Sequence, residues 1–173
     1  LATGSDTSVL WSSNSATVIG RSANGNPEIQ NVGGIAGSME NGATGKLLTN
    51  VGNVYGETNT GGLSGNMTDA TIVSTGPTSA NYNNGKIDGE INTGGIAGQM
   101  SNSVLEHVYN TNEGKTLNTQ ISGSIDYIKN ALNNKSEYGQ VTGKTNTGGI
   151  AGQMSGTSKI DTAYNAGKKK KKK

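Results

Sequence analysis

The chain has 173 residues, of which 28 are Gly, 30% are hydrophobic and none is Cys, so disulfides, thiolate metal sites and Cys nucleophiles are excluded. Six of its 14 basic residues are Lys168 to Lys173, so the net charge of +2 hides a body with 8 Lys and Arg against 12 Asp and Glu. This body has one Arg, Arg21, and lacks the clustered basic face of a nucleic-acid binder.

Residues 1–14 open the chain and contain its one Trp, Trp11. The start, LATGSDTSVLW, lacks the basic region and long apolar stretch of a signal peptide. No apolar run approaches the ~18 residues of a membrane span. We expect the segment around Trp11 to cap the N-terminal end of the fold, and we expect no membrane span.

A repeat dominates residues 15–167. Its core stands at 31–39 (NVGGIAGSM), 59–67 (NTGGLSGNM), 92–100 (NTGGIAGQM) and 146–154 (NTGGIAGQM). Before these copies stand VIG (18–20), VYGETN (54–59), IDGEIN (87–92) and VTGKTN (141–146). The Gly-Gly pairs are 28, 33 and 54 residues apart, and the last spacing indicates one degenerate or expanded coil. So little apolar material suits stacked repeats, in which each coil buries its face on its neighbours.

Short β-branched segments bounded by Gly, Asn and Thr predict strands joined by turns. Alternation within a strand would place Ile35, Gly37 and Met39 on one face. Equivalent positions of stacked coils lie ~4.8 Å apart, so the repeat predicts ladders of identical residues. The core ladders are Ile35, Leu63, Ile96 and Ile150, and Met39, Met67, Met100 and Met154. A structural Asn ladder at a corner would contain Asn31, Asn59, Asn92 and Asn146.

A second element of the coil follows the third and fourth copies, and one stretch after it breaks the pattern. An apolar element ending in Tyr-Asn follows both, at 104–112 (VLEHVYNTN) and 160–167 (IDTAYNAG), but not directly after the second copy. Ile125, Ile128 and Leu132 then have helical spacing. We expect a short inserted helix near 124–134, which covers the solenoid or docks a partner.

Lys168 to Lys173 end the chain as a homopolymer. We expect an artificial appendage, and the alternative is a native segment that grips teichoic acid, anionic lipid or DNA. The domain organisation is thus an N-terminal segment (1–14), a Gly-rich solenoid (15–167) and a poly-Lys tail (168–173).

The stretch GGIAGQMSGTSKIDTAYNAG (148–167) resembles the GLUG repeat of large bacterial surface proteins, including adhesin-like proteins and some secreted peptidases. The likeness covers roughly residues 15–167. It implies a β-solenoid stalk and transfers no catalytic residue. The regular Met, the inserted helix and the missing Tyr-Asn depart from the family pattern.

Enzyme and cofactor sites find little support in the motifs. The phosphate loop fails because Lys46 is followed by Leu47, and the calcium repeat fails because GGIAGQM carries no carboxylate. His107 is the one histidine, is expected to point outward, and has no triad motif near it. The Met ladder could bind Cu(I), but a packed core column explains it better. We expect no catalytic residue, no metal and no cofactor.

Two further surfaces stay open as alternatives. The T-x-T triplets at 58–60 and 145–147 could order water for ice binding, and sparse carboxylates could serve a carbohydrate-active β-helix. The variable turns at 40–50, 74–85 and 110–122 are the expected contact surfaces.

Together these features predict an all-β parallel solenoid of about five coils that is not an enzyme. The expected function is a stalk or adhesin-like segment of an extracellular or cell-surface bacterial protein, which binds through variable loops. Its partners would be other segments of a larger surface protein, a host protein or a glycan. The alternative is a subunit that stacks on itself into an extracellular fibre.

Overall fold

A computed structural model describes residues 1–22, 29–76, 79–111 and 139–172. Within these ranges the secondary structure consists of strands β1 to β22, without an α-helix. Every pair of neighbouring strands is parallel. The prediction of an all-β fold of stacked parallel sheets is confirmed. The helix expected near 124–134 lies outside the described residues.

The strands form four sheets, which we name A to D. Sheet A contains β1 (Ala2–Thr3), β6 (Ala36–Glu40), β11 (Ser64–Thr68), β16 (Ala97–Ser101) and β20 (Ala151–Ser155). Sheet B contains β2 (Ser8–Leu10), β3 (Ser13–Asn14), β7 (Thr44–Lys46), β8 (Thr49–Asn50), β12 (Thr71–Ile72), β13 (Asn81–Asn83), β17 (Val104–Asn110) and β21 (Lys159–Asn165). Sheet C contains β4 (Val18–Ile19), β9 (Val54–Tyr55), β14 (Ile87–Asp88), β18 (Val141–Gly143) and β22 (Lys169–Lys171). Sheet D contains β5 (Gln30–Gly33), β10 (Thr58–Gly61), β15 (Ile91–Gly94) and β19 (Thr145–Gly148).

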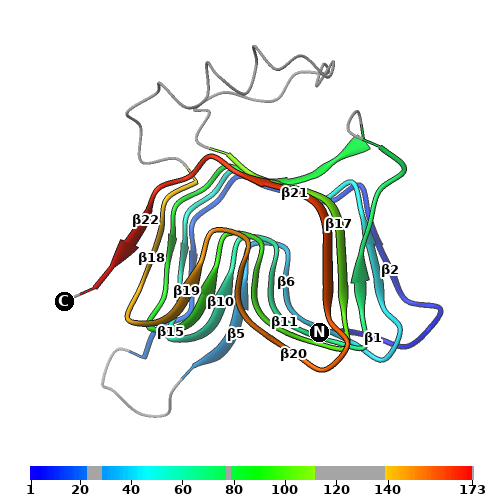
Figure 1. Cartoon of the computed structure of the whole chain (residues 1–173), viewed down its shortest axis with the longest axis horizontal. Helices are drawn as coiled ribbons and strands as arrows, with labels where there is room; N and C mark the ends of the chain where they lie inside the picture. The colour runs from blue at the N-terminus through cyan, green and yellow to red at the C-terminus, as the bar shows by residue number, and fades with distance from the viewer. Residues whose placement is uncertain (23–28, 77–78, 112–138, 173) are drawn as a thin grey trace.

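Each turn of the chain visits the sheets in the order A, B, C, D and then returns to A one strand further along the stack. Figure 1 looks along the stack and shows that the chain bends inward between sheets D and A. The cross-section is therefore divided into two compartments, one between sheets A and B and one between sheets C and D.

The two compartments are filled differently. The A/B compartment holds the larger apolar cluster, in which Met, Leu and Ile side chains are fully buried. The C/D compartment holds a small cluster of Val32, Val54, Ile87 and Val141, with Val18 packed against it. Burial of these stacked columns is the main stabilising contribution that each turn receives from its neighbours.

Strand pairing explains the irregular repeat spacing. Met100 in β16 pairs directly with Met154 in β20, so the 54 residues between the last two copies form a single expanded turn. The extra residues lie between β17 and β18. The apparently missing Tyr-Asn is Tyr82-Asn83, which pairs with Tyr109-Asn110 after an insertion that separates β12 from β13.

Both end segments contribute strands to the sheets. Residues 2–14 supply β1, β2 and β3, which pair with β6, β7 and β8. The segment around Trp11, expected to cap the N-terminal end, forms this first turn, and Trp11 itself is 80% exposed. The lysine tail supplies β22, which pairs with β18.

The prediction of a variable turn at 40–50 is wrong. These residues supply β7 and β8, and Ala43, Leu48 and Asn50 are buried. Similarly, the end of the range 74–85 belongs to β13. Short strands interrupted by Gly carry too weak a periodic signal to be separated from a turn.

Candidate functional site

The predicted Met and Ile positions stack in the A/B compartment. Met67 pairs with Met39 on one side and with Met100 on the other, and all three are fully buried. Met154 continues the column but is 42% exposed. Leu63 and Ile96 are buried, whereas Ile35 and Ile150 pack against the cluster from its ends. These side chains fill the core and offer no free thioether inside the stack.

The predicted Asn residues meet at the corner within sheet D. Asn59 donates from Nδ2 to Asn31 Oδ1, Asn92 to Asn59, and Asn146 to Asn92, each at 2.8 Å. All four have positive φ, between 50° and 60°. Asn tolerates this left-handed backbone better than most residues, so one residue type serves both the bend and the ladder. We call this set the corner Asn ladder.

A second Asn ladder was not predicted from the sequence. It runs through the core, with amide-to-amide hydrogen bonds of 2.6–2.8 Å between neighbours. The members of this core Asn ladder are Asn14, Asn50, Asn83, Asn110 and Asn165. Each Asn also donates to a backbone carbonyl, for example Asn83 to Gly85 at 2.8 Å. The motif Asn-x-Gly or Asn-x-Ala at four of these positions was the signal that could have revealed it.

The glycines of the motif make room for these ladders. A Cβ on the first Gly of each pair would lie within 2.0 Å of a backbone carbonyl oxygen. A Cβ on the second Gly would lie 2.5 Å from the Cγ of a core-ladder Asn, as for Gly62 and Asn83. A Cβ on Gly37 would lie 2.6 Å from the Asn31 carbonyl oxygen in sheet D, so the expectation that Gly37 shares the Met39 face is wrong.

The T-x-T triplets do not present two threonines to one surface. In the first triplet Thr60 is fully buried and Thr58 only half-buried. In the second, Thr145 is exposed, whereas Thr147 Oγ1 would lie 2.5 Å from a Cβ on Gly143. The positive φ of the Asn between the two threonines breaks the period of two that would otherwise place both on one face. The flat threonine array required for ice binding therefore does not form at these residues.

His107 lies at a bend of β17 rather than on a regular outward face. Its φ is 50°, its side chain is 19% exposed, and its Nδ1 lies 3.5 Å from Glu106 Oε1. Thr162 occupies the corresponding position of β21 and also has a positive φ. The bend is thus a feature of the turn and is not specific to histidine.

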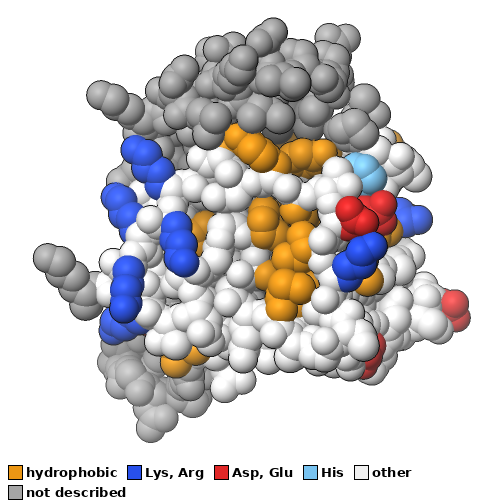
Figure 2. All heavy atoms as spheres, in the orientation of Figure 1, with side chains coloured by type: hydrophobic (Ala, Val, Ile, Leu, Met, Phe, Trp, Pro, Cys, Tyr) orange, Lys and Arg blue, Asp and Glu red, His pale blue; other side chains and the backbone are white. Residues whose placement is uncertain are grey.

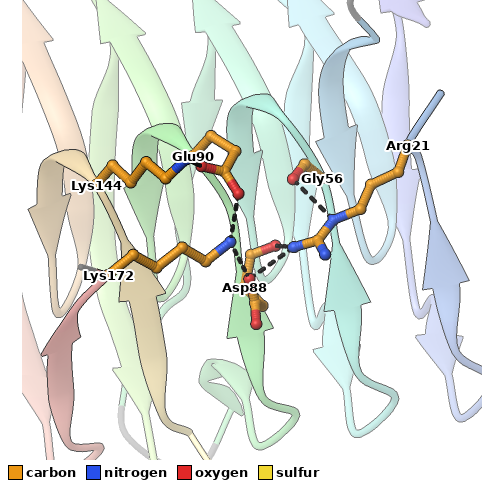
Figure 3. A network of polar contacts seen from close by, with 6 residues as sticks. All are labelled: Arg21, Gly56, Asp88, Glu90, Lys144 and Lys172. Carbon is orange, nitrogen blue, oxygen red and sulfur yellow. Dashed lines mark hydrogen bonds and ion pairs between the residues drawn. The ribbon is translucent and has the colours of Figure 1, made fainter. Parts of the chain in front are cut away.

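A network of charged side chains lies along sheet C and the turn from sheet C to sheet D, and we call it the charge network (Figure 3). Arg21 Nη2 lies 2.6 Å from Asp88 Oδ1, and Arg21 Nε donates to the Gly56 carbonyl at 3.3 Å. The Arg21 guanidinium also lies 5.6 Å from the centre of the Tyr55 ring. These contacts connect the turns that contain β4, β9 and β14.

The other half of the charge network contains two lysines. Lys172 Nζ lies 2.5 Å from Asp88 Oδ1 and 2.6 Å from Glu90 Oε1, and Lys144 Nζ lies 2.8 Å from Glu90 Oε2. Asp88 thus binds cations from an earlier and a later turn, whereas both cations bound by Glu90 come from later turns. Figure 3 shows Lys172 reaching from the lysine strand toward both carboxylates.

Electrostatics keep Glu90 ionised at this position. Burial would by itself raise the pKa of Glu90, but hydrogen bonds and charge from Lys144 and Lys172 lower it below the usual glutamate value. The side chains of Asp88 and Lys172 are each 18% exposed, so this is the most sheltered ion pair of the network. The arrangement can hold an ammonium group, and within the described ranges no group of three His, Cys, Asp or Glu could hold a metal ion.

The end of the stack formed by β20, β21 and β22 carries both apolar and charged side chains. Figure 2 looks onto it and shows an apolar patch near the middle, several Lys or Arg side chains along the left edge, and a smaller group of acidic and basic side chains on the right. Met154, Ile150 and Ile160 belong to the apolar patch. In the part of the chain that the structure covers, no helix has the length and apolarity needed to cross a membrane.

Comparisons with known proteins add no relative. No protein-family model matches the chain, and neither curated proteins nor solved structures give a significant match.

Proposed function

We propose that the chain is a non-enzymatic repeat segment of an extracellular or cell-surface bacterial protein, with a stalk or adhesin-like role. The observation that supports it best is the internal use of the repeated side chains. In the corner and core Asn ladders each Asn side chain hydrogen-bonds the next. The Met column is buried, and the motif glycines stand where the backbone is too closely packed for a Cβ. A repeat of this kind maintains a shape and leaves recognition to residues that do not repeat.

The proposal includes the GLUG-type resemblance, a solenoid of about five coils and a short helix over 124–134. The insertions between β12 and β13 and between β17 and β18 interrupt sheet B and the connection to sheet C. Recognition of a host protein or glycan would use such insertions, because a rigid scaffold commonly carries its variable contact residues on loops.

An array experiment tests the recognition role. Labelled chain is applied to glycan and host extracellular-protein arrays, beside a variant in which 112–138 is replaced by a short Gly-Ser linker. Circular dichroism of both proteins serves as the folding control. We expect the parent chain to bind a defined ligand and the variant to lose it. Equal binding by both would overturn recognition through this insertion, and hydrolysis of a polysaccharide would overturn the non-enzymatic role.

A self-stacking fibre subunit is the second candidate, and the exposed end of the Met column favours it. Met154 is 42% exposed although its three partners in the column are fully buried. Parallel edges with exposed apolar groups favour pairing with further strands. Electron microscopy and size-exclusion chromatography over a concentration series distinguish the candidates: fibres favour self-stacking, and monomers at every concentration exclude it.

A further inference from the structure

The lysine strand β22 occupies a position that its sequence does not suit. In sheet C the positions facing the C/D compartment are Val18, Val54, Ile87 and Val141, which pair in register. Lys169 is the next member of this column, paired with Val141. Since a lysine contributes no apolar group of that shape, hydrophobic matching does not explain why the tail adopts this register.

Backbone pairing and one side chain explain the register instead. Val141 N donates to the Lys168 carbonyl and Lys172 N donates to the Gly143 carbonyl, both at 2.8 Å. Through these hydrogen bonds β22 pairs as a parallel strand with the open edge of β18. This is the geometry by which an extended peptide adds a strand to a sheet.

The side chain that fixes the position is Lys172. Its ammonium crosses β18 and lies between Asp88 and Glu90, at 2.5 and 2.6 Å. Lys169, Lys170 and Lys171 are exposed, and in the part of the tail that the structure describes only Lys172 forms an ion pair. The recognition element is therefore an extended backbone with one ammonium at a fixed offset.

We propose that the edge of β18, together with Asp88 and Glu90, is a docking site for an extended lysine-bearing peptide from a second polypeptide, and that residues 168–172 occupy it as an internal ligand. Two features specify this occupant: the acceptors Asp88 Oδ1 and Glu90 Oε1, which together hold one ammonium, and the parallel pairing already seen with β22. An acidic or a helical partner fits neither feature. The inference does not depend on the stalk or adhesin-like role.

The first test measures how firmly the internal ligand is docked. Trypsin cleavage within 168–172 of the full chain is followed by mass spectrometry, because a paired strand is a poor protease substrate. We expect the Asp88→Asn/Glu90→Gln variant to be cleaved roughly tenfold faster than the parent, given the strength of charged hydrogen bonds. The control Asp6→Asn/Asp69→Asn removes the same charge elsewhere and should leave the rate unchanged.

A second variant keeps this test decisive if the acidic residues are needed for folding. Lys172→Ala removes the ammonium alone and should also accelerate cleavage, whereas Lys170→Ala should not. Equal rates for Lys172→Ala and Lys170→Ala would overturn the role of the Lys172 position.

The second test uses a ligand in trans. Fluorescence anisotropy measures binding of labelled acetyl-hexalysine amide to the full chain and to Lys172→Ala. The internal ligand competes at high effective concentration in the parent, so we expect roughly tenfold tighter binding to Lys172→Ala. Adding Asp88→Asn/Glu90→Gln to Lys172→Ala should abolish the gain.

The D-lysine form of the same peptide separates strand pairing from charge attraction. It has equal charge but cannot form the same parallel ladder, so we expect it to bind weakly to every variant. Equal binding of the L and D peptides, or no gain in Lys172→Ala, would overturn the proposal.

Discussion

The A/B and C/D compartments are built from the same turns of chain and yet have different cores. The A/B compartment is wide and takes Met, Leu and Ile, which are fully buried in columns. The C/D compartment is narrow and takes Val and Ile from sheet C, facing Val32, Thr60 and Thr93 from sheet D. The difference shows that one repeat can specify two core widths, because side-chain size is fixed separately at each position.

Glycine sets the narrow width. A Cβ on Gly56 would lie 2.2 Å from Thr60 Oγ1, and one on Gly89 would lie 2.2 Å from Thr93 Oγ1. The Gly of the V/I-x-G motif therefore lets sheet C approach sheet D. The threonine hydroxyls face these glycines and have no hydrogen-bond partner. The narrow compartment thus combines close contact with unsatisfied polar atoms.

The largest effect is expected from emptying the wide compartment. Met100→Ala should lower the free energy of unfolding by about 2–5 kcal/mol, because it leaves a cavity in a fully buried column. Met154→Ala is the matched control and should have a much smaller effect, since Met154 is 42% exposed. Urea denaturation followed by circular dichroism measures both. Similar losses for the two variants would contradict the assignment of this column as the core.

Filling the narrow compartment should have the next largest effect. Gly89→Ala would place a Cβ 2.2 Å from Thr93 Oγ1 and 3.0 Å from Thr60 Cβ, and overpacking of this kind costs about 1–3 kcal/mol. Gly76→Ala is the control, because a Cβ there meets no atom within 4 Å. The same urea experiment applies. A neutral Gly89→Ala would show that sheets C and D separate easily.

Particular residues show what the sequence could and could not predict. The four Met residues and the corner Asn residues recur at one motif position, so their stacking followed from repetition alone. The core Asn ladder was missed because its members stand at varied distances from the motif, after insertions of different length. The outward position of one Thr in each triplet depends on a positive φ at the central Asn. The regular alternation of side chains along a strand, on which the prediction rested, does not include such a bend.

The charge network was also beyond prediction. Arg21, Asp88 and Lys172 are far apart in sequence and come together only because the number of residues per turn aligns them. Spacing between repeats fixes which strands pair, but insertions decide which surface side chains meet.

Removing an unsatisfied hydroxyl should stabilise the narrow compartment. Thr93→Val replaces a buried Oγ1 that lacks a partner, and we expect a gain of about 1 kcal/mol in the free energy of unfolding. Valine fits, because Val32 occupies the corresponding position opposite Gly20. Thr145→Val, on the exposed side, should be close to neutral. Destabilisation by Thr93→Val would show that the hydroxyl has a stabilising partner.

The smallest effect is expected outside the narrow compartment, from acidification of the charge network. Lys144 and Lys172 lower the pKa of Glu90 despite its partial burial, so its contribution to stability is complete at neutral pH. That contribution declines as pH falls below the usual glutamate pKa and through the lowered one. Because solvent screens these partly exposed charges, the free energy of unfolding should fall by only about 0.5 kcal/mol.

Urea denaturation at pH 7 and pH 3 checks this for the parent and for Glu90→Gln. The parent should lose more stability on acidification than Glu90→Gln, and 1 M NaCl at pH 7 should reduce the difference between them, because salt screens partly exposed charges. Glu106→Gln is the control for a carboxylate of sheet B that contacts neither lysine of the network, and it should follow the parent. If Glu90→Gln also followed the parent, the lysines would not stabilise the ionised carboxylate. Of the charge network, only the ion pairs of Asp88 with Arg21 and Lys172 would then remain to support backbone pairing between these turns.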